Sequence, residues 1–573
     1  MSLRALALSV FVLAFGALPA AAQEVAERIE DFVTTSHAYG LFNGTVLVAE
    51  GGELVYAAGV GEADKSWGIP NTTETKFRIA SLTKQFTAAL VLQLVEDGQI
   101  DLDAPISTYL PDYPSAQADR VTVHHLLSHT GGVPEHTGRP DMGEIMRRAY
   151  APEDFLALFA ELPLDFEPGS AFRYSNSGYY LLGVIVERVT GETFAVALRD
   201  RLLAPLGLRD TGYDPFPEIV PSLARGYVRT SGGFANAPYI DTSVPYAAGM
   251  MVSTAPDLYR WTQALHRGDV FRDAATTERM LTPVRDDYGY GIGVSTLPIG
   301  DQQVRAVAHS GGIPGFSTML IHLPERDQTI VVLDNTQGSA GALARSLAML
   351  LYDQPVDVPK PPIGMVMGQR IESDGVDAAV AFYRSLRDGD SDGFDLDEDA
   401  LNTLGYAYLE RGDVATARRL FELNVESYPE AWNPHDSLGE ALLAAGDTAR
   451  AVASYRRSLE LNPGNDNGRD VLTGLGADAT VASVEVSEAV LDRYVGRYAV
   501  QPSFVVAVTR EGTQLYVQAT GQPRFDVVPV TQTRFALTAV DAQVSFVTDG
   551  DGPATSMILH QGGQDTPAAR VVE

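Results

Sequence analysis

The chain contains no cysteine at all. This absence excludes disulfide bonds, a thiol nucleophile, a lipid-carrying cysteine and zinc sites built on thiolates. Lysine is also scarce and occurs only at Lys65, Lys76, Lys84 and Lys360. Aspartate and glutamate together number 74 against 42 lysines and arginines, for a net charge of -32. Such a surface repels nucleic acid and anionic membranes, so we expect no nucleic-acid partner.

Long apolar runs are missing too, and the one apolar stretch of note stands at the N-terminus. Residues 1–22 carry Arg4, then an apolar segment over 5–18, then three alanines before Gln23. This order of charge, apolar core and small residues predicts a signal peptide over residues 1–22. The alternative, an uncleaved anchor, needs about 18 apolar residues or more. We therefore expect a periplasmic or secreted protein without stable membrane insertion after cleavage.

A chain of 573 residues is too long for a single hydrophobic core, and its patterns divide it into parts. Residues 23–353 alternate helical and strand patterns, and the proline-rich stretch 354–362 marks a linker. Apolar alternation predicts strands near both ends of the first part, with helices between them. We expect strands over 44–49, 53–58, 304–308, 317–323 and 329–333, and helices over 82–94 and 340–352. This order favours an α/β domain of the α+β type, with an antiparallel sheet flanked by helices.

Residues 363–476 contain an internal repeat with a spacing of 34 residues. The same residue types return 34 positions later: a leucine, a glycine, a Gly-Asp pair, an alanine, an aromatic residue and a proline. For example, Gly405 corresponds to Gly439, and Phe421 corresponds to Tyr455. The period resembles tetratricopeptide repeats, which implies paired helices with a Gly-Asp turn between them. Helical residues 376–387 add part of a third unit, and the acidic run 388–399 after them favours a solvated segment. Both a peptide-binding groove for a protein partner and a packing spacer are compatible with so few repeats.

The last part, residues 486–573, alternates apolar and polar residues between turn signals. Segments 515–517, 525–528 and 544–547 are typical of short strands. We expect a small all-β domain, either a barrel or a sandwich, without a catalytic constellation.

The first chemical pattern joins Ser81 and Lys84 at the start of the expected helix 82–94. Positions i and i+3 share one helix face, so the ammonium can reach the hydroxyl. Partial burial would lower the pKa of Lys84 and let it act as a base, while the helix N-terminus favours negative charge on the serine oxygen. Alone this pattern arises by chance on many helices, so its weight depends on other motifs.

Two other motifs accompany it, Tyr174-Ser175-Asn176 and His309-Ser310-Gly311-Gly312. The three together resemble the signature of the serine beta-lactamase and penicillin-binding protein superfamily, and the Tyr-x-Asn form is similar to its class C branch. Stretches 126–134, 166–169 and 248–257 fit as well, so the resemblance covers about residues 24–352. It implies a beta-lactamase-like sheet flanked by helices, plus an all-helical subdomain.

The resemblance also implies a role for each motif residue. Ser81 would be the nucleophile, Lys84 its hydrogen-bonded activator, and Tyr174 a phenolic general acid or base. Tyr174 could titrate near neutral pH only if nearby cations, Lys84 and His309, stabilised its phenolate. Asn176 would hold Lys84 and the substrate's acyl amide. The backbone N–H groups of Ser81 and Gly312 would form the oxyanion hole, with room left by the glycines at 311 and 312.

The third motif departs from the superfamily pattern, because His309 and Ser310 stand where lysine and threonine are common. Histidine keeps a hydrogen-bond donor but does not guarantee a positive charge at neutral pH. Resembling proteins with this form include D-alanyl-D-alanine peptidases and D-amino-acid amidases or esterases. A substrate carboxylate could still be met by Ser310 and a protonated His309, whereas strong beta-lactamase activity is disfavoured.

The expected function is therefore an exported serine hydrolase without metal or cofactor. It would form an acyl-enzyme with D-alanyl peptides, amides or small esters, as a DD-carboxypeptidase, amidase or esterase with at most weak beta-lactamase activity. The alternative is an inactive scaffold whose helical repeats recruit a peptide partner. Among the other polar residues, His129 is typical of a structural hydrogen-bonding group, and His124 and His125 show no metal-ligand pattern.

Overall fold

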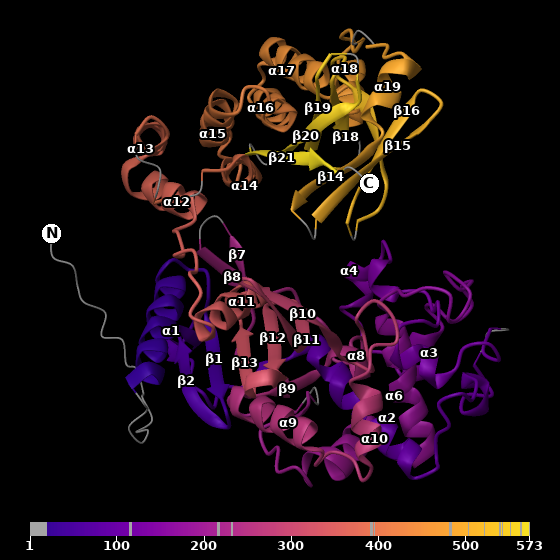
Figure 1. The fold of residues 1–573 in the computed structure, drawn as a ribbon. Helices are drawn as coiled ribbons and strands as arrows, with labels where there is room; N and C mark the ends of the chain where they lie inside the picture. The colour runs from indigo at the N-terminus through magenta and orange to yellow at the C-terminus, as the bar shows by residue number, and fades with distance from the viewer. Residues whose placement is uncertain are drawn as a thin grey trace, which may run out of the picture. The chain divides into compact units, whose positions relative to one another are not determined.

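The chain folds into two compact units in the computed structural model (Figure 1). The first unit ends at Pro359, and the second unit begins at Lys360. The structure describes residues 20–113, 117–214, 218–230, 233–389, 393–394, 396–480, 484–501, 504–520, 522–537, 540, 542–550, 552–561 and 564–571. The predicted signal peptide lies outside these residues apart from its last three positions. None of the described helices is long and apolar enough to cross a bilayer.

A six-stranded antiparallel sheet forms the centre of the first unit, in the order β10-β11-β12-β13-β1-β2. Its strands are β1 (Gly44–Glu50), β2 (Glu53–Val60), β10 (Gly293–Ile299), β11 (Gln302–Ile313), β12 (Phe316–Leu323) and β13 (Gln328–Asp334). The N-terminal hairpin joins the C-terminal strands because Gly44 pairs with Asp334 and Glu50 with Gln328. The antiparallel sheet predicted from strands at both ends is confirmed.

One edge of this sheet departs from the sequence prediction. Strand β10 was not expected, because its polar residues and Pro298 interrupt the alternation that marks a strand. Proline is tolerated in edge strands, where its missing N–H need not enter a ladder. Pairing of β10 with β11 ends at Gly293 and Ala308, so the last five residues of β11 have no β10 partner.

Helices cover both faces of the sheet. Helices α1 (Ala20–Ala38) and α11 (Ala340–Leu351) pack on one face in a shared apolar core with β1 and β13 (Figure 1). The other face packs against α9 (Ala255–Arg267), and α2 (Thr83–Glu96) and α6 (Asn176–Thr190) belong to the same large core. Helix α2 is buried almost all round, which explains its continuous apolar sequence.

Short elements complete the first unit. They are α3 (Val123–Leu127), α4 (Met142–Ile145), α5 (Pro152–Leu156), α7 (Phe194–Leu198), α8 (Tyr246–Gly249), α10 (Ala274–Met280), β3 (Glu62–Asp64), β4 (Ile69–Pro70), β5 (Phe77–Arg78), β6 (Gly212–Tyr213), β7 (Tyr227–Thr230), β8 (Gly233–Asn236), β9 (Met251–Ser253), the 3-10 turns at Ala80–Leu82, Ile106–Thr108, His136–Gly138 and Pro324–Arg326, and a π-helical turn at Arg199–Leu203.

The second unit begins with a run of helices. They are α12 (Ile363–Asp374), α13 (Val376–Arg387), α14 (Glu398–Glu410), α15 (Val414–Ser427), α16 (Trp432–Ala444), α17 (Thr448–Leu461) and α18 (Asp466–Gly474). Helices α14 and α15 recur as α16 and α17 at the same spacing of 34 residues. Asp413 and Asp447 cap the second helix of each pair by accepting a backbone N–H three residues on.

Glycine at the repeated position lets the paired helices touch. A Cβ at Gly405 would lie 2.5 Å from the Phe421 ring, and one at Gly439 would lie 2.8 Å from the Tyr455 ring. The repeat therefore preserves one glycine–aromatic contact in each helix pair, and this packing fixes how closely the two helices approach.

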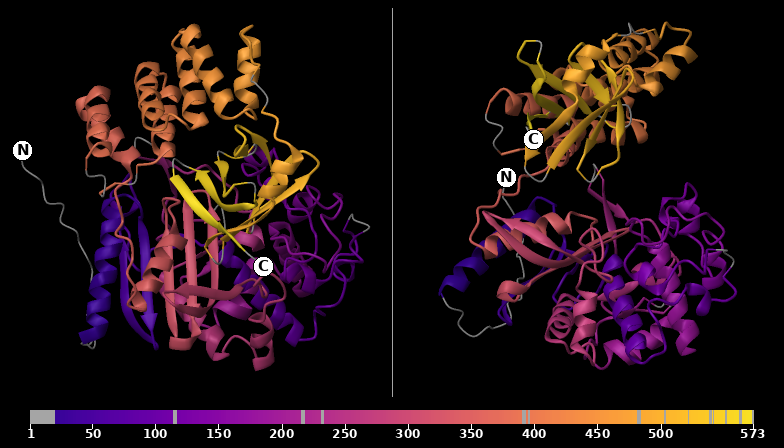
Figure 2. Two further views of the ribbon diagram at one scale, coloured as in Figure 1. Left: turned by 45° about the horizontal axis from the view of Figure 1, so that its top comes forward. Right: turned by 45° about the vertical axis from the view of Figure 1, so that its right-hand side comes forward.

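A closed eight-stranded barrel follows helix α19 (Glu488–Tyr494) (Figure 2). Its strands are β14 (Gly496–Gln501), β15 (Phe504–Glu511), β16 (Gln514–Ala519), β17 (Phe525–Pro529), β18 (Arg534–Leu537), β19 (Ala542–Thr548), β20 (Ala554–Gln561) and β21 (Gln564–Arg570). Neighbouring strands are antiparallel, and β14 pairs with β21 to close the barrel. Of the two all-β alternatives, the barrel is correct.

Replacing Gly439 with alanine should loosen the second helix pair. The new methyl would press on the Tyr455 ring, at a cost of about 1–3 kcal/mol that exceeds the gain of about 1 kcal/mol in helix propensity. Hydrogen–deuterium exchange of the full chain should therefore rise in peptides from α16 and α17. Gly474→Ala is the matched control, because a Cβ there meets nothing within 4 Å. Equal exchange in both variants would contradict the packing role of Gly439.

Candidate active site

Ser81 lies in the tight turn Ala80–Leu82, between strand β5 and helix α2. Ala80 adopts a positive φ of 48°, a strained conformation for a residue with a Cβ. The turn is held by the carbonyl of Ile79, which accepts from Thr318 Oγ1 at 3.0 Å, and by Thr83 Oγ1, which accepts the Met251 N–H at 3.1 Å. This support leaves Ser81 half-buried.

Lys84 is fully buried and donates to three oxygen atoms. Its Nζ lies 3.1 Å from Ser81 Oγ, 2.7 Å from Asn176 Oδ1 and 2.8 Å from the Ala248 carbonyl. Burial lowers the pKa of Lys84 to about 7, against the opposing charge of Glu135. At neutral pH a large fraction of Lys84 is therefore an uncharged amine beside the Ser81 hydroxyl.

Tyr174 lies next to this pair, with its ring centroid 4.7 Å from Lys84 Nζ. Its hydroxyl is buried and makes no full hydrogen bond. Burial raises the pKa of Tyr174, and the negative charge of Glu135 raises it further. The neighbouring Ser81 hydroxyl lowers the pKa in part. The resting side chain is thus a neutral phenol, and the condition for a phenolate, stabilisation by Lys84 and His309, is not met. Burial outweighs these two residues because His309 is neutral and Lys84 is only partly protonated at neutral pH.

Asn176 connects Lys84 to a carboxylate that the sequence motifs did not reveal. The Glu135 carboxylate accepts from the Asn176 backbone N–H and, at 3.1 Å, from its Nδ2, and from the N–H and hydroxyl of Thr137. Burial opposes the charge, but His136 and the hydrogen bonds from Thr137 and Asn176 hold the pKa of Glu135 below its ordinary value. An ionised carboxylate therefore lies behind Asn176 and fixes its orientation.

The signal for Glu135 was present but ambiguous. It follows the Ser-His-Thr-Gly-Gly-Val-Pro stretch, and an isolated glutamate after a proline is typical of an exposed loop. Only the packing of this loop against the start of α6 brings its carboxylate, which is 21% exposed, to Asn176.

His309 is buried on β11 and bound at both ring nitrogens. Its Nε2 lies 2.9 Å from the Tyr288 hydroxyl, and its Nδ1 lies 2.6 Å from the Ser310 carbonyl. Burial and the Lys84 charge lower the pKa of His309 to about 4. His309 is therefore neutral at neutral pH, so the protonated form considered for binding a substrate carboxylate is absent. Ser310, the next residue, is exposed.

The two glycines after Ser310 differ in their surroundings. A Cβ at Gly311 would lie 2.3 Å from the Ile79 carbonyl oxygen and 3.1 Å from Ala80 Cβ, so glycine is needed for β11 to pack on the turn that carries Ser81. A Cβ at Gly312 would meet nothing within 4 Å. At Gly311, the space expected for a substrate is occupied by the turn that carries Ser81. At Gly312, the space on the Cβ side is open. The backbone of Gly312 lies in the part of β11 that has no β10 partner.

His129 supports the site from behind. It has a positive φ of 56°, and its Nδ1 accepts the Ser175 N–H at 3.0 Å. Burial holds the pKa of His129 well below its ordinary value. Its contacts are those of a structural hydrogen-bonding group, and they fix the segment that joins Tyr174 to Asn176.

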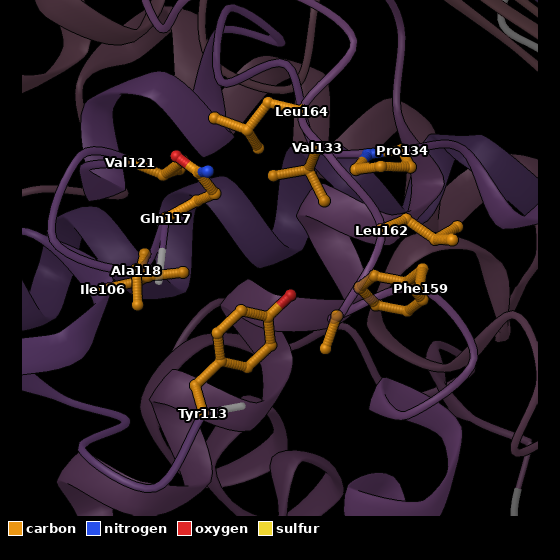
Figure 3. Close-up of a pocket in the computed structure, with 11 residues that line it drawn as sticks. Ile106, Tyr113, Gln117, Ala118, Val121, Val133, Pro134, Phe159, Leu162 and Leu164 are labelled. Carbon is orange, nitrogen blue, oxygen red and sulfur yellow. The ribbon is translucent and has the colours of Figure 1, made fainter. Parts of the chain in front are cut away.

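A nearby cavity is too small to hold a substrate. It is lined by apolar side chains that include Val133, Pro134, Phe159 and Leu164, with the Tyr113 ring on one side (Figure 3). Its volume of about 10 Å³ admits at most one water molecule. Elsewhere in the described part of the chain, no group of three histidine or acidic side chains is placed to hold a metal ion.

Four groups from distant segments therefore meet in one place: a half-buried hydroxyl, an amine of lowered pKa, a neutral phenol and an amide held by a carboxylate. The amine can remove the hydroxyl proton, and the phenol can donate a proton to a leaving atom. This arrangement is suited to nucleophilic acyl transfer.

Comparisons with known proteins identify the family of the first unit. The profile of the Beta-lactamase family matches residues 25–354, and that of a domain of unknown function, DUF3471, matches residues 482–570. A penicillin-binding protein of Bacillus subtilis is 27% identical over 552 residues, covering 92% of this chain and 95% of its own. The esterase EstB of Burkholderia gladioli is 37% identical over 188 residues, 30% of this chain and 47% of its own.

A solved structure shares the fold of the first unit. The D-amino acid amidase of Ochrobactrum anthropi SV3 matches with a TM-score of 0.50 and 27% identity, over 58% of this chain and 99% of its own. Because the family profile spans more than half of the chain and contains Ser81, Lys84, Tyr174 and His309, this protein belongs to the Beta-lactamase family of serine hydrolases.

Proposed function

We propose that this protein is an exported hydrolase that forms an acyl-enzyme at Ser81 with D-alanyl peptides, amides or small esters. The observation that carries the proposal is the contact of Ser81 Oγ with the buried amine of Lys84 at 3.1 Å. A lysine whose pKa is lowered to about 7 can take up the serine proton near neutral pH.

The proposed reaction has two halves. Ser81 Oγ attacks the acyl carbon while its proton passes to Lys84, and the leaving group takes a proton from the Lys84–Tyr174 pair. Water then attacks the acyl carbon and gives a proton to Lys84 or Tyr174. The bond from this carbon to Ser81 Oγ breaks, and the same proton passes to Oγ, so the acid product and free Ser81 are formed. The backbone N–H groups of Ser81 and Gly312 are the proposed donors to the oxyanion, since β11 packs directly on the turn of Ser81.

The neutral state of His309 supports a preference among the proposed substrates. A carboxylate at the end of a D-alanyl peptide would meet the exposed Ser310 hydroxyl and an uncharged imidazole. Hydrogen bonds to a charged group are strongest when the partner is a cation, so this subsite gives a carboxylate little stabilisation. We place neutral esters and amides ahead of carboxylate-terminated peptides. The family relatives include an esterase and an amidase by name.

Three substitutions test the acyl-enzyme directly. Ser81→Ala should abolish burst release from an activated ester, and Lys84→Ala and Tyr174→Phe should each lower the acylation rate by about 10²–10⁴-fold, the usual contribution of a positioned acid or base. Lys76→Ala is the matched control, because this lysine instead pairs with Asp210 at 3.1 Å. Wild-type protein that shows neither burst nor adduct would favour the inactive-scaffold alternative.

Glu135 should set the pH dependence of acylation. The charge of Glu135 raises the pKa of Lys84, so Glu135→Gln removes a negative charge that favours the protonated amine. Because the base must be neutral, the acid limb of kcat/KM, centred near pH 7 in the wild type, should move to lower pH in the variant. Glu144→Gln, on α4, where the Glu144 side chain pairs with Arg148, should leave the limb in place. An unmoved limb in Glu135→Gln would refute the electrostatic role.

The charge of the leaving portion should control the rate. For two substrates with the same acyl part, a D-alanyl methyl ester and a D-alanyl-D-alanine peptide, we expect a higher kcat/KM for the ester between pH 7 and 8. Amidating the peptide C-terminus should recover part of the difference, because it removes the charge without changing the scissile amide. A peptide that loses activity on amidation would show that this site does recognise a carboxylate.

A further inference from the structure

Three polar side chains form a hydrogen-bonded chain on neighbouring strands of the C-terminal barrel. Ser545 Oγ on β19 lies 2.7 Å from His560 Nε2 on β20. The other ring nitrogen, His560 Nδ1, lies 2.5 Å from Asp565 Oδ1 on β21. The strand register explains this contact, because His560 pairs with Asp565 on one side and with Gln543, two residues before Ser545, on the other.

The carboxylate decides the direction of both hydrogen bonds. An ionised aspartate only accepts, so Nδ1 of His560 must carry the hydrogen that it gives to Asp565. In the neutral imidazole, Nε2 is then the acceptor, and Ser545 donates its hydroxyl hydrogen to it. His560 is thus oriented as a base toward Ser545, and the serine lone pairs are directed away from the imidazole.

The cluster lies on the outer face of the barrel but is partly covered. Alternate residues Val544, Phe546 and Met557 point into the barrel core, so Ser545 and His560 lie on the opposite face. The His560 side chain is only 17% exposed. On the same face, Gln543 is buried and its Nε2 donates to the Leu461 carbonyl at the end of α17. The end of the helical run therefore covers the face beside Ser545.

A cationic side chain lies opposite the serine. Arg534 on β18 is the direct ladder partner of Ser545, which places both side chains on the same face of the sheet. Its guanidinium Nε is buried and has no hydrogen-bond partner among the residues that the structure describes. A buried donor without a partner is costly, and a negative oxygen formed on an acyl group at Ser545 would satisfy it.

We propose that Ser545, His560 and Asp565 form a second reactive-serine site that takes small activated esters and organophosphorus compounds. Ser545 Oγ bonds to the acyl carbon or the phosphorus while its proton passes to His560 Nε2. The bond to the leaving alkoxide or fluoride breaks, and the leaving group departs with the electron pair of that bond and accepts the proton from His560. Asp565 holds the imidazole, and Arg534 faces the oxygen that gains charge.

The chemistry of this site is limited by what surrounds the serine. The backbone around Ser545 belongs to ladders with β18 and β20, so the oxyanion would rely on one guanidinium in place of paired backbone donors. Losing one oxyanion donor typically costs about 10²–10³ in rate. The site should therefore acylate with good leaving groups and turn over slowly, unlike the family site at Ser81.

The test uses full-length protein with the first site removed. Ser81→Ala protein is treated with a small fluorophosphonate, and the adduct is located by intact mass and peptide mapping. We expect one adduct, on the peptide that contains Ser545, formed at least 10-fold faster than in Ser81→Ala/His560→Gln. Ser81→Ala/Ser556→Ala, which removes a half-buried serine of β20, should label at the parent rate. Ser81→Ala/Asp565→Asn gives a second variant if the histidine change disturbs the barrel.

No adduct in Ser81→Ala protein, or equal rates with and without His560, would overturn the proposal. Because these rates are measured in protein that lacks Ser81, their outcome does not depend on whether the first site is active. Labelling of wild-type protein at Ser81 alone would likewise count against Ser545, and labelling at Ser545 alone would support it while contradicting the function proposed for Ser81.

Discussion

The site around Ser81 depends on one physical constraint, the burial of the Lys84 ammonium group away from water. Lys84 is fully buried, and each of its three hydrogen bonds reaches a different segment: the turn of Ser81, the start of α6 and the carbonyl of Ala248. A buried charge is tolerated only when it is paired or neutralised. Here Glu135 and the three oxygen acceptors supply part of that compensation, and a pKa near 7 supplies the rest. The same balance that makes burial of Lys84 tolerable gives the residue the lowered pKa that its proposed role as a base requires.

This balance explains why the neighbouring residues are neutral. Both His309 and Tyr174 lie in the same dry environment, where burial disfavours any charged form. Lys84 adds to the effect at His309, because two cations so close together would repel each other. One carboxylate and one partly protonated lysine thus carry the charge of the site.

The sequence predicted the parts of this arrangement that depend on periodicity and short motifs. The strands of the antiparallel sheet, the helix after Ser81 and the contact from Lys84 to Ser81 follow from alternation and from the i, i+3 geometry of a helix. Glu135 and strand β10 could not be predicted in this way. Glu135 reaches Asn176 only because its loop packs against the start of α6. Strand β10 lies at the edge of the sheet, and its polar residues do not alternate with apolar ones. The charge states of His309 and Tyr174 could not be predicted either, because they depend on burial, which a short sequence motif does not specify.

The glycines show how the same residue type acts through different constraints. At Gly405 and Gly439 a side chain would strike an aromatic ring, so the repeat signal in the sequence records helix packing. At Gly311 it would strike the carbonyl of Ile79, so this glycine holds β11 against the turn of Ser81. Gly312 has open space on its Cβ side, and no packing demand explains it. Gly312 lies in a strand segment without a β10 neighbour and beside the proposed nucleophile Ser81, so its open Cβ side fits the proposed approach of a substrate. The unpaired end of β11 is then the surface along which an acyl group would be aligned for attack by Ser81.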